Sequence, residues 1–318
     1  MRTTRLFVLP AAAVTCLLFA AAALAAQRER VFVASYGSDS NPCTFGSPCK
    51  TFQFAHDTVA AGGEVTAIDS AGFGPLAITK AITITSPAGI EAGIAAPATG
   101  ISTAITINTP SSATVVLSGL TLEGANSAHT GINYGGAGNL EIVNCVVRNY
   151  VVDGINVEPT SGSPSVLISN TIVSGGSNGI FIFAPSGTIQ AALDHVTIGN
   201  SNLGLGVETS GEAVEVQVSD SHIDNNGNYG IFTSGSSTAA TVNVILSNVT
   251  LNQTPPGIDL VGHTNMWLSG VTQTAVPAFT SVGVNFDGTS TANAAFSDNT
   301  NHLMGGVSGG MLQAWTKQ

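Results

Sequence analysis

A six-residue pattern recurs along the chain, with one short apolar stretch before and another after a small or polar position. The copies occupy residues 117–122, 142–147, 168–173, 193–198, 218–223 and 246–251, and a weaker seventh begins at Leu268. The shared position is Gly119, Asn144, Asn170, His195, Asp220, Asn248 and Gly270, and it advances by 25, 26, 25, 25, 28 and 22 residues. Repetition at this period predicts a solenoid in which each copy forms one coil.

Within each coil, apolar and small polar residues alternate over only a few positions, which is the period of a half-buried strand rather than a helix. We therefore expect three short strands per coil, stacked in parallel on the next coil at about 4.8 Å. The inward side chains should form columns. One column is Leu120, Cys145, Thr171, Val196, Ser221 and Val249, and another is Leu122, Val147, Val173, Ile198, Ile223 and Leu251. Cys145 is thus predicted to be a core residue.

The first 26 residues read as an export signal, because Arg2 and Arg5 precede an apolar stretch that ends in small residues at Ala23–Ala25. A retained membrane anchor is the alternative, but the stretch is Ala-rich and short. Its removal leaves six basic residues against 19 acidic ones, a net charge of −13. Such a surface repels nucleic acid and anionic lipid, so neither nucleic acid nor a membrane is an expected partner of the mature chain. We expect a secreted or periplasmic protein.

Residues 27–63 differ from the repeats and predict a cap for the solenoid of residues 64–318. Ser47 and Pro48 favour a helix start, and Gly62–Gly63 favour its end, so we expect a short helix from Lys50 to Ala61. An uncapped solenoid end would expose apolar side chains and strand edges. Cys43 and Cys49 should form a small disulfide loop in an oxidising compartment, and this segment offers too few ligands for a metal.

The sequence GSDSNPCT at residues 37–44, followed by CKTF at 49–52 and by coils punctuated with Asn, resembles bacterial right-handed parallel β-helix repeat proteins of the pectin-lyase-like superfamily. The resemblance covers the mature chain and implies an all-β, right-handed, single-stranded parallel β-helix with a short N-terminal capping helix. It does not fix an activity, because that superfamily contains lyases, hydrolases, esterases and tail-spikes.

The shared turn position also resembles a feature of that superfamily, the asparagine ladder between the second and third strands. We expect the side chains of this ladder to satisfy turn amides and one another. The predicted ladder is Asn144, Asn170, His195, Asp220 and Asn248. On this interpretation His195 and Asp220 are structural residues and not a catalytic pair.

The strand that begins at each Gly-apolar pair, such as Gly179-Ile180, corresponds to the strand that lines the substrate groove in superfamily members acting on polysaccharide. Its outward positions supply the candidate ligand-binding residues Asn133, Asn156, Glu158, Phe181, Glu208, Phe232 and Asp259. Phe181 and Phe232 should lie two coils apart, about 10 Å, which suits stacking on alternate sugars. The simpler alternative is an ordinary solvated strand face, with Phe181 and Phe183 covered by a long turn.

Catalysis has weak candidates in Arg148, Asp153, Glu158 and Glu208. Pectate and pectin lyases that resemble this fold use a basic residue, often Arg, to remove a proton, which makes Arg148 a candidate base. Glu123 stands one coil below Arg148, however, and predicts an ion pair instead. Glu158 and Glu208 are two coils apart, at the upper limit for the carboxyl pair of an inverting glycosidase. The calcium-binding aspartates of pectate lyases and the paired aspartates of polygalacturonases are not recognisable.

The leading hypothesis is therefore an exported β-helix that binds polysaccharide or another surface ligand along one strand face without catalysis, and that needs no cofactor or metal. A polysaccharide lyase or glycoside hydrolase is the first alternative, and a structural or adhesive surface protein is the second. The sequence specifies neither the glycan nor an oligomeric state.

Overall fold

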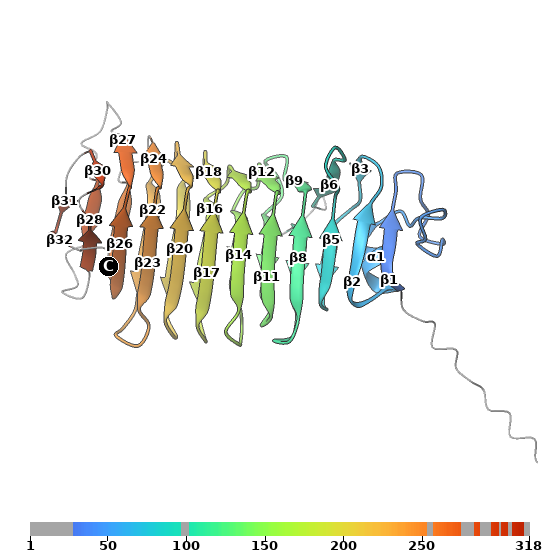
Figure 1. The fold of residues 1–318 in the computed structure, drawn as a ribbon, viewed down its shortest axis with the longest axis horizontal. Coiled ribbons are helices and arrows are strands. Elements are labelled where there is room, and N and C mark those ends of the chain that lie inside the picture. Colours follow the sequence, from blue (N-terminus) through green and yellow to red (C-terminus); the bar gives the residue numbers. More distant parts are fainter. Residues whose placement is uncertain are drawn as a thin grey trace, which may run out of the picture.

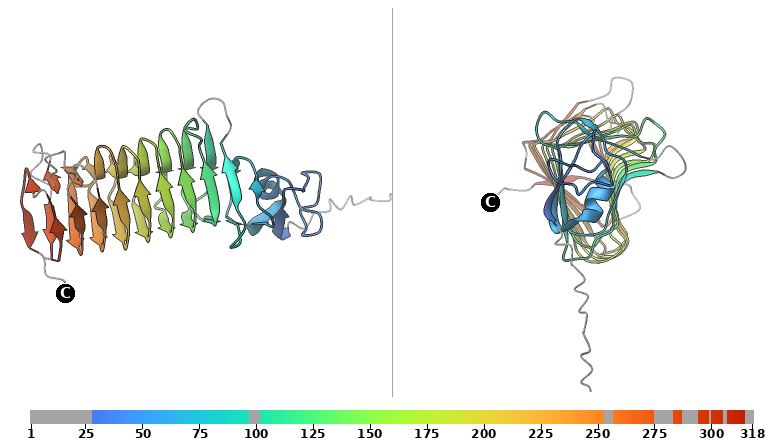
Figure 2. Two further views of the ribbon diagram at one scale, coloured as in Figure 1. Left: turned by 90° about the horizontal axis from the view of Figure 1, so that it is seen from above. Right: turned by 90° about the vertical axis from the view of Figure 1, so that its right-hand side faces the viewer.

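The described part of the chain winds into one elongated solenoid (Figures 1 and 2). The structure is a computed structural model that describes residues 28–96, 102–252, 257–274, 283–286, 294–298, 300–304 and 307–314. The predicted export signal lies outside these residues. None of the helices in the described ranges is long and apolar enough to cross a membrane.

The strands form three parallel sheets that run along the solenoid. Sheet I contains β1 (Arg28–Val33), β2 (Val59–Ala67), β5 (Ile82–Thr85), β8 (Thr114–Ser118), β11 (Asn139–Val143), β14 (Ser165–Ser169), β17 (Ile189–Asp194), β20 (Val214–Ser219), β23 (Val242–Ser247), β26 (Thr264–Ser269), β29 (Ala294–Ser297) and β32 (Leu312–Ala314). Sheet II contains β4 (Leu76–Ile78), β7 (Thr103–Ile107), β10 (Thr130–Tyr134), β13 (Asp153–Val157), β16 (Asn178–Ala184), β19 (Leu203–Thr209), β22 (Tyr229–Gly235), β25 (Ile258–Gly262), β28 (Val284–Phe286) and β31 (Val307–Ser308). Sheet III contains β3 (Ala71–Gly72), β6 (Ala92–Ala95), β9 (Leu120–Glu123), β12 (Val146–Arg148), β15 (Ile172–Ser174), β18 (Thr197–Gly199), β21 (His222–Asp224), β24 (Thr250–Asn252), β27 (Thr272–Thr274) and β30 (His302–Leu303).

The three-strand coil predicted from the repeat is confirmed. The column from Leu122 to Leu251 pairs residue by residue across sheet III, and all six of its side chains are fully buried. Burying each such aliphatic side chain contributes about 1.5–3 kcal/mol relative to leaving it exposed. Because every coil adds one residue to the column, the core is continuous along the solenoid.

The shared turn position between sheets I and III adopts the left-handed conformation, with φ of 55° at Asn144, 47° at Asn170 and 53° at His195. The side chains at this position are exposed, unlike the amide-satisfying ladder that we expected. The backbone satisfies the turn instead, since the N–H of each of the five ladder residues donates to a carbonyl of the next coil, as Asn170 does to Asp194 at 3.0 Å. Among the ladder residues, one side-chain bond joins two members, from Asn248 Nδ2 to Asp220 Oδ1 at 3.1 Å. Asn and Asp occur here because they tolerate a positive φ.

The buried turn amides find their partners one position further on, in the inward column. The Cys145 N–H donates to Thr171 Oγ1 at 3.3 Å, and the Val196 N–H donates to Ser221 Oγ at 3.1 Å. Both hydroxyl side chains are fully or almost fully buried. Thr171 and Ser221 are thus the polar members of an otherwise apolar column because they accept bonds from the neighbouring coil.

Replacing Asn170 with alanine is expected to cost about 1 kcal/mol of stability, because alanine lacks the local hydrogen bonding that lets Asn enter the left-handed region. Asn170→Gly is the matched control and should lose little, because glycine adopts a positive φ freely. Urea unfolding of both variants measures the difference. Equal losses in the two variants would show that the Asn170 side chain, and not its backbone conformation, stabilises the turn.

The N-terminal cap differs from its prediction in detail. The helix α1 spans Phe52–Thr58, shorter than the predicted 50–61, and its N-cap is Thr51 rather than Ser47. Ser47 instead belongs to the loop closed by the disulfide between Cys43 and Cys49. Gly62 and Gly63 do not end the helix, since both lie inside strand β2. The chain changes to an extended conformation at Val59, so the strand starts before the glycines.

The helix α1 lies at the N-terminal end of the solenoid (Figure 2) and buries Phe52 and Ala55. The Phe52 ring contacts Phe73 at a centroid distance of 5.0 Å. Strand β1, from the same N-terminal segment, pairs with β2 and is the first strand of sheet I. The segment therefore closes the core and extends a sheet at once.

Cys145 should be chemically silent in the folded protein, because its side chain is buried and desolvation raises its pKa to about 11. A thiol reagent at pH 8 is expected to find no reactive group in the native mature protein and one in the denatured protein. Three thiols after denaturation would show that the disulfide between Cys43 and Cys49 does not form.

Candidate functional site

The outer face of sheet II carries five of the seven sequence-predicted ligand residues in one continuous row, and Glu158 and Glu208 lie two positions further along their strands. Strand pairing places Asn156 between Asn133 and Phe181, and Gly206 between Phe181 and Phe232. The row from β10 to β28 reads Asn133, Asn156, Phe181, Gly206, Phe232, Asp259 and Asn285. The side chains on either side along each strand, such as Ile180 and Ile182, are fully buried, so this row faces outward.

Four aromatic side chains, Phe181, Phe183, Tyr229 and Phe232, form what we call the aromatic patch. The Phe181 and Phe183 rings lie 6.4 Å apart, and the Tyr229 and Phe232 rings 5.5 Å apart. Gly206 separates the two pairs, and a Cβ atom placed on it would lie 2.6 Å from Phe181 Cδ2. The Phe181 ring therefore occupies the space above Gly206 that a side chain would otherwise fill. This contact, together with that of Phe232 with Tyr229, is consistent with the half-buried state of both rings.

On the N-terminal side of the aromatic patch lies a group that we call the polar cluster: Asn133, Asp153, Asn156, Glu158 and Asn178. Asn156 Nδ2 donates to Asn133 Oδ1 at 2.9 Å and to Glu158 Oε2 at 3.5 Å. Asn178 Nδ2 donates to Asp153 Oδ1 at 2.8 Å. In the described part of the chain, the buried oxygen Asn156 Oδ1 has no hydrogen-bond partner. The cluster therefore retains an unused acceptor beside the aromatic rings.

Asp259, on the other side of the aromatic patch, is less available than the sequence suggested. Its side chain is only 5 % exposed, and Asn285 Nδ2 donates to Asp259 Oδ1 at 2.6 Å. The accessible part of the row thus runs from its first residue, Asn133, to Phe232.

Asp153 is only 8 % exposed, and this burial raises its pKa, although the hydrogen bond from Asn178 opposes the shift. A carboxyl whose pKa is higher in the folded state than in the unfolded state contributes to the stability of the fold when it is protonated. That contribution is fully present below the unfolded-state pKa and is lost as the pH rises through the folded-state pKa.

Asp153→Asn should therefore unfold at a higher temperature than the wild type at pH 7, because it removes a buried charge and keeps the acceptor for Asn178. The advantage should shrink as the pH falls towards 4, since the wild-type carboxyl then takes up its proton. Thermal unfolding across this pH range tests it, with the exposed Glu91→Gln as control. A variant less stable than the wild type at pH 7 would contradict the assigned cost of burial.

Glu158 and Glu208 occupy equivalent outward positions two coils apart, with Phe183 between them. Phe183 pairs directly with Glu208, and Glu158 follows the last paired residue of β13. The coil spacing places their backbones about 10 Å apart. Partial burial raises the pKa of Glu208, which favours its protonated form relative to an exposed glutamate.

Arg148 does not join these carboxylates. It lies on strand β12 of sheet III, where its Nε donates to Glu123 Oε2 at 2.7 Å. Asn149 Nδ2 occupies the other oxygen of Glu123 at 2.9 Å. The structure therefore places Arg148 in an ion pair on sheet III, away from the candidate residues on the outer face of sheet II.

Asp194, His195 and Asp220 are the described residues whose side chains could approach one metal ion, since their ligand atoms lie within 4.8 Å of one another. Protein groups already contact these atoms. His195 Nδ1 lies 2.8 Å from Asp194 Oδ2, and Ser219 Oγ donates to Asp194 Oδ1 at 2.6 Å. These hydrogen bonds account for the arrangement, which lies at the turn between sheets I and III and not on sheet II.

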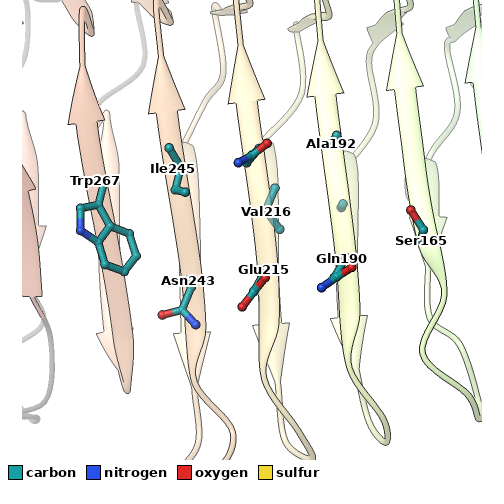
Figure 3. Close-up of a pocket in the computed structure, with 10 residues that line it drawn as sticks. Ser165, Gln190, Ala192, Glu215, Val216, Asn243, Ile245 and Trp267 are labelled. Atoms are coloured by element: carbon teal, nitrogen blue, oxygen red, sulfur yellow. The ribbon is translucent and has the colours of Figure 1, made fainter. Parts of the chain in front are cut away.

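A hollow of about 520 Å³ on the outer face of sheet I was missed by the sequence reasoning, which followed only the strand after each glycine. Figure 3 shows the side chains that line it, on adjacent strands of the sheet. The lining residues are Ser165, Gln190, Ala191, Ala192, Glu215, Val216, Gln217, Asn243, Ile245 and Trp267. A sequence signal existed in the outward column of sheet I, where Ala192 is followed two coils later by Ile245 and then by Trp267.

The chain belongs to the right-handed β-helix family, because the family model described as "Right handed beta helix region" matches residues 101–272. This match agrees with the resemblance of the sequence to β-helix proteins of the pectin-lyase-like superfamily. No match was found among curated protein sequences.

Among solved structures, the chain is similar to the crystal structure of pectate lyase Pel9A, with 11% sequence identity and a TM-score of 0.54, over 87% of this chain and 78% of that one. It is also similar to the A-modules of the Azotobacter vinelandii mannuronan C-5 epimerases AlgE4 and AlgE6. Their identities are 11% and 14% and their TM-scores 0.37 and 0.32, and each comparison covers 91% of this chain and 89% of the module. At such identities the likeness concerns the fold alone.

Proposed function

We propose that this protein is exported and binds a polysaccharide along the outer face of sheet II. The observation that carries the proposal is the direct continuation of the aromatic patch into the polar cluster on adjacent strands of one sheet face. Aromatic rings offer flat apolar surfaces to the C–H faces of sugars, and carboxamides can donate to and accept from sugar hydroxyl groups. The parallel coils repeat at about 4.8 Å, so such contacts can follow a linear polymer.

The scaffold supports binding because it holds these side chains without requiring a loop to fold around the ligand. Each strand of the face is paired on both sides, and the inward neighbours Ile180, Leu205 and Ile231 are fully buried. A site ordered before binding loses less conformational entropy when the ligand arrives. The disulfide between Cys43 and Cys49 is consistent with an oxidising compartment, which supports export.

Electrophoresis of the mature protein through gels that contain single polysaccharides tests the proposal. We expect retarded migration in at least one gel of a panel of neutral and acidic polysaccharides, relative to a gel without polysaccharide. Unchanged migration in every gel, at polysaccharide concentrations that retard an established carbohydrate-binding protein, would overturn the proposal.

Glycoside hydrolysis is a second candidate, favoured by Glu208, whose pKa is raised by burial two coils from Glu158. A raised pKa favours the protonated form, which is the form that the general acid of an inverting glycosidase requires. Release of reducing ends from a bound polysaccharide, abolished by Glu208→Gln, would establish this activity. Binding without such release supports the binding function alone.

A further inference from the structure

The hollow on sheet I has a flat aromatic wall at one end and a small residue in its floor. Strand pairing sets Ala192, Gln217, Ile245 and Trp267 in one outward column across β17, β20, β23 and β26. Figure 3 shows Trp267 at one end of this column and Ser165 at the other end of the hollow. Ala192 leaves open space where its neighbours carry longer side chains, and this contributes to the hollow.

The indole of Trp267 is held in a fixed orientation. It stacks on Phe296 of the next coil at a centroid distance of 5.5 Å and an interplanar angle of 14°. Trp267 also lines the hollow, together with Ile245 from the preceding coil. A planar ring that is already packed can contact a ligand at little cost in side-chain entropy.

The polar side chains of the hollow are available for a ligand. In the described part of the chain, the side chains of Gln190, Glu215 and Gln217 form no hydrogen bond with a protein group. Asn243 Oδ1 accepts from Asn265 Nδ2 at 3.0 Å, which leaves the Asn243 amide hydrogens free. Carboxamides on one surface offer both donors and acceptors, which is what a run of hydroxyl groups requires.

The charge of the lining selects against anionic ligands. Glu215 is the ionisable residue among the ten that line the hollow, and no Lys or Arg accompanies it. A glycan that carries carboxylates would meet this negative charge without a compensating cation. The hollow spans the strands from β14 to β26, about 19 Å at the spacing of parallel strands, which is the length of a short oligosaccharide.

We propose that the hollow on sheet I is a second carbohydrate site, which binds an uncharged oligosaccharide with one sugar stacked near Trp267. The proposal does not rest on the function proposed for sheet II, because the two faces share no residue. Two separated sites on one rigid rod would let the protein hold two glycan segments together.

Intrinsic fluorescence tests this proposal, because the chain contains only two tryptophans, Trp267 and Trp315. In a Trp315→Phe background, the emission of Trp267 should change saturably with at least one of cellohexaose, mannohexaose, laminarihexaose and xylohexaose. Hexagalacturonate should give no change or bind at least ten-fold more weakly. The double variant Phe181→Ala, Phe232→Ala should keep this response, so loss of the sheet II site is distinguished from loss of this one.

Ala192→Phe is the blocking variant, because a phenyl group at this outward position would fill the floor of the hollow without entering the core. It should weaken the neutral hexasaccharide at least ten-fold while the melting temperature stays near that of the wild type. Gln217→Ala is the second variant, which removes a polar contact and adds no bulk, and it should also weaken binding. No response to any neutral hexasaccharide, a response that both variants leave unchanged, or tighter binding of hexagalacturonate would each overturn the proposal.

Discussion

Replacing Gly179 with alanine is expected to destabilise the solenoid by about 3 kcal/mol, the upper part of the usual range for overpacking a core. A Cβ atom on Gly179 would lie 2.4 Å from Ile198 Cγ2 and 2.8 Å from the carbonyl oxygen of Gly204. The backbone cannot move away easily, because β16 is paired with β13 on one side and β19 on the other. Urea unfolding should show a clearly lower midpoint.

Gly72→Ala is the matched control, since Gly72 also lies in a strand but a Cβ atom on it would meet nothing within 4 Å. Its unfolding midpoint should stay close to that of the wild type. The same crowding recurs in other coils, where Gly154 and Gly204 each stand against a carbonyl of the next coil. A stable Gly179→Ala protein would therefore contradict the close stacking of coils behind the candidate face.

The double variant Phe181→Ala, Phe232→Ala should weaken polysaccharide binding by about 30-fold or more. Aromatic anchors at the centre of an interface commonly contribute 1 kcal/mol or more each, and a total of about 2 kcal/mol corresponds to such a factor. Stability should fall only modestly, because both rings are half-buried on the outer face, whereas truncating a core phenylalanine costs about 3–5 kcal/mol. Affinity gels and thermal unfolding measure the two effects separately.

Phe45→Ala is the control for this variant, because Phe45 is a 67% exposed aromatic residue in the N-terminal cap and should not contribute to binding. A double variant that melts far below the wild type would show that the rings support the core. A stable double variant with unchanged affinity would remove the aromatic patch from the binding site.

The repeat made the architecture and the strand register predictable. A shift of one residue would exchange the buried and exposed faces of a strand, so the apolar positions of the repeat fix which side chains point inward. The outward order of Asn156, Phe181 and Phe232 follows directly from the spacing of the glycines. Composition and spacing alone could not show that the Phe181 ring would lie over Gly206. That orientation depends on the absence of a side chain one coil away.

Other differences arise where local sequence signals compete with tertiary contacts. Ser47 and Pro48 resemble a helix start, but the Cys43–Cys49 disulfide and the bridge from Val33 to Cys49 hold them in a loop. At the turn between sheets I and III, the sequence pointed to the side chain of Asn170. The structure instead assigns the buried hydrogen bond to Thr171, the next residue. The polar character was visible in the sequence, but the partner of each polar atom was not.

Hydroxyl-radical footprinting with a retained polysaccharide tests the central claim most directly, since it reports side-chain accessibility residue by residue. The polysaccharide should protect Phe181, Phe183, Tyr229 and Phe232, while Tyr36 and Phe45 in the exposed N-terminal cap should oxidise at an unchanged rate. Protection confined to other residues, with the aromatic patch as reactive as in the free protein, would contradict polysaccharide binding on the outer face of sheet II.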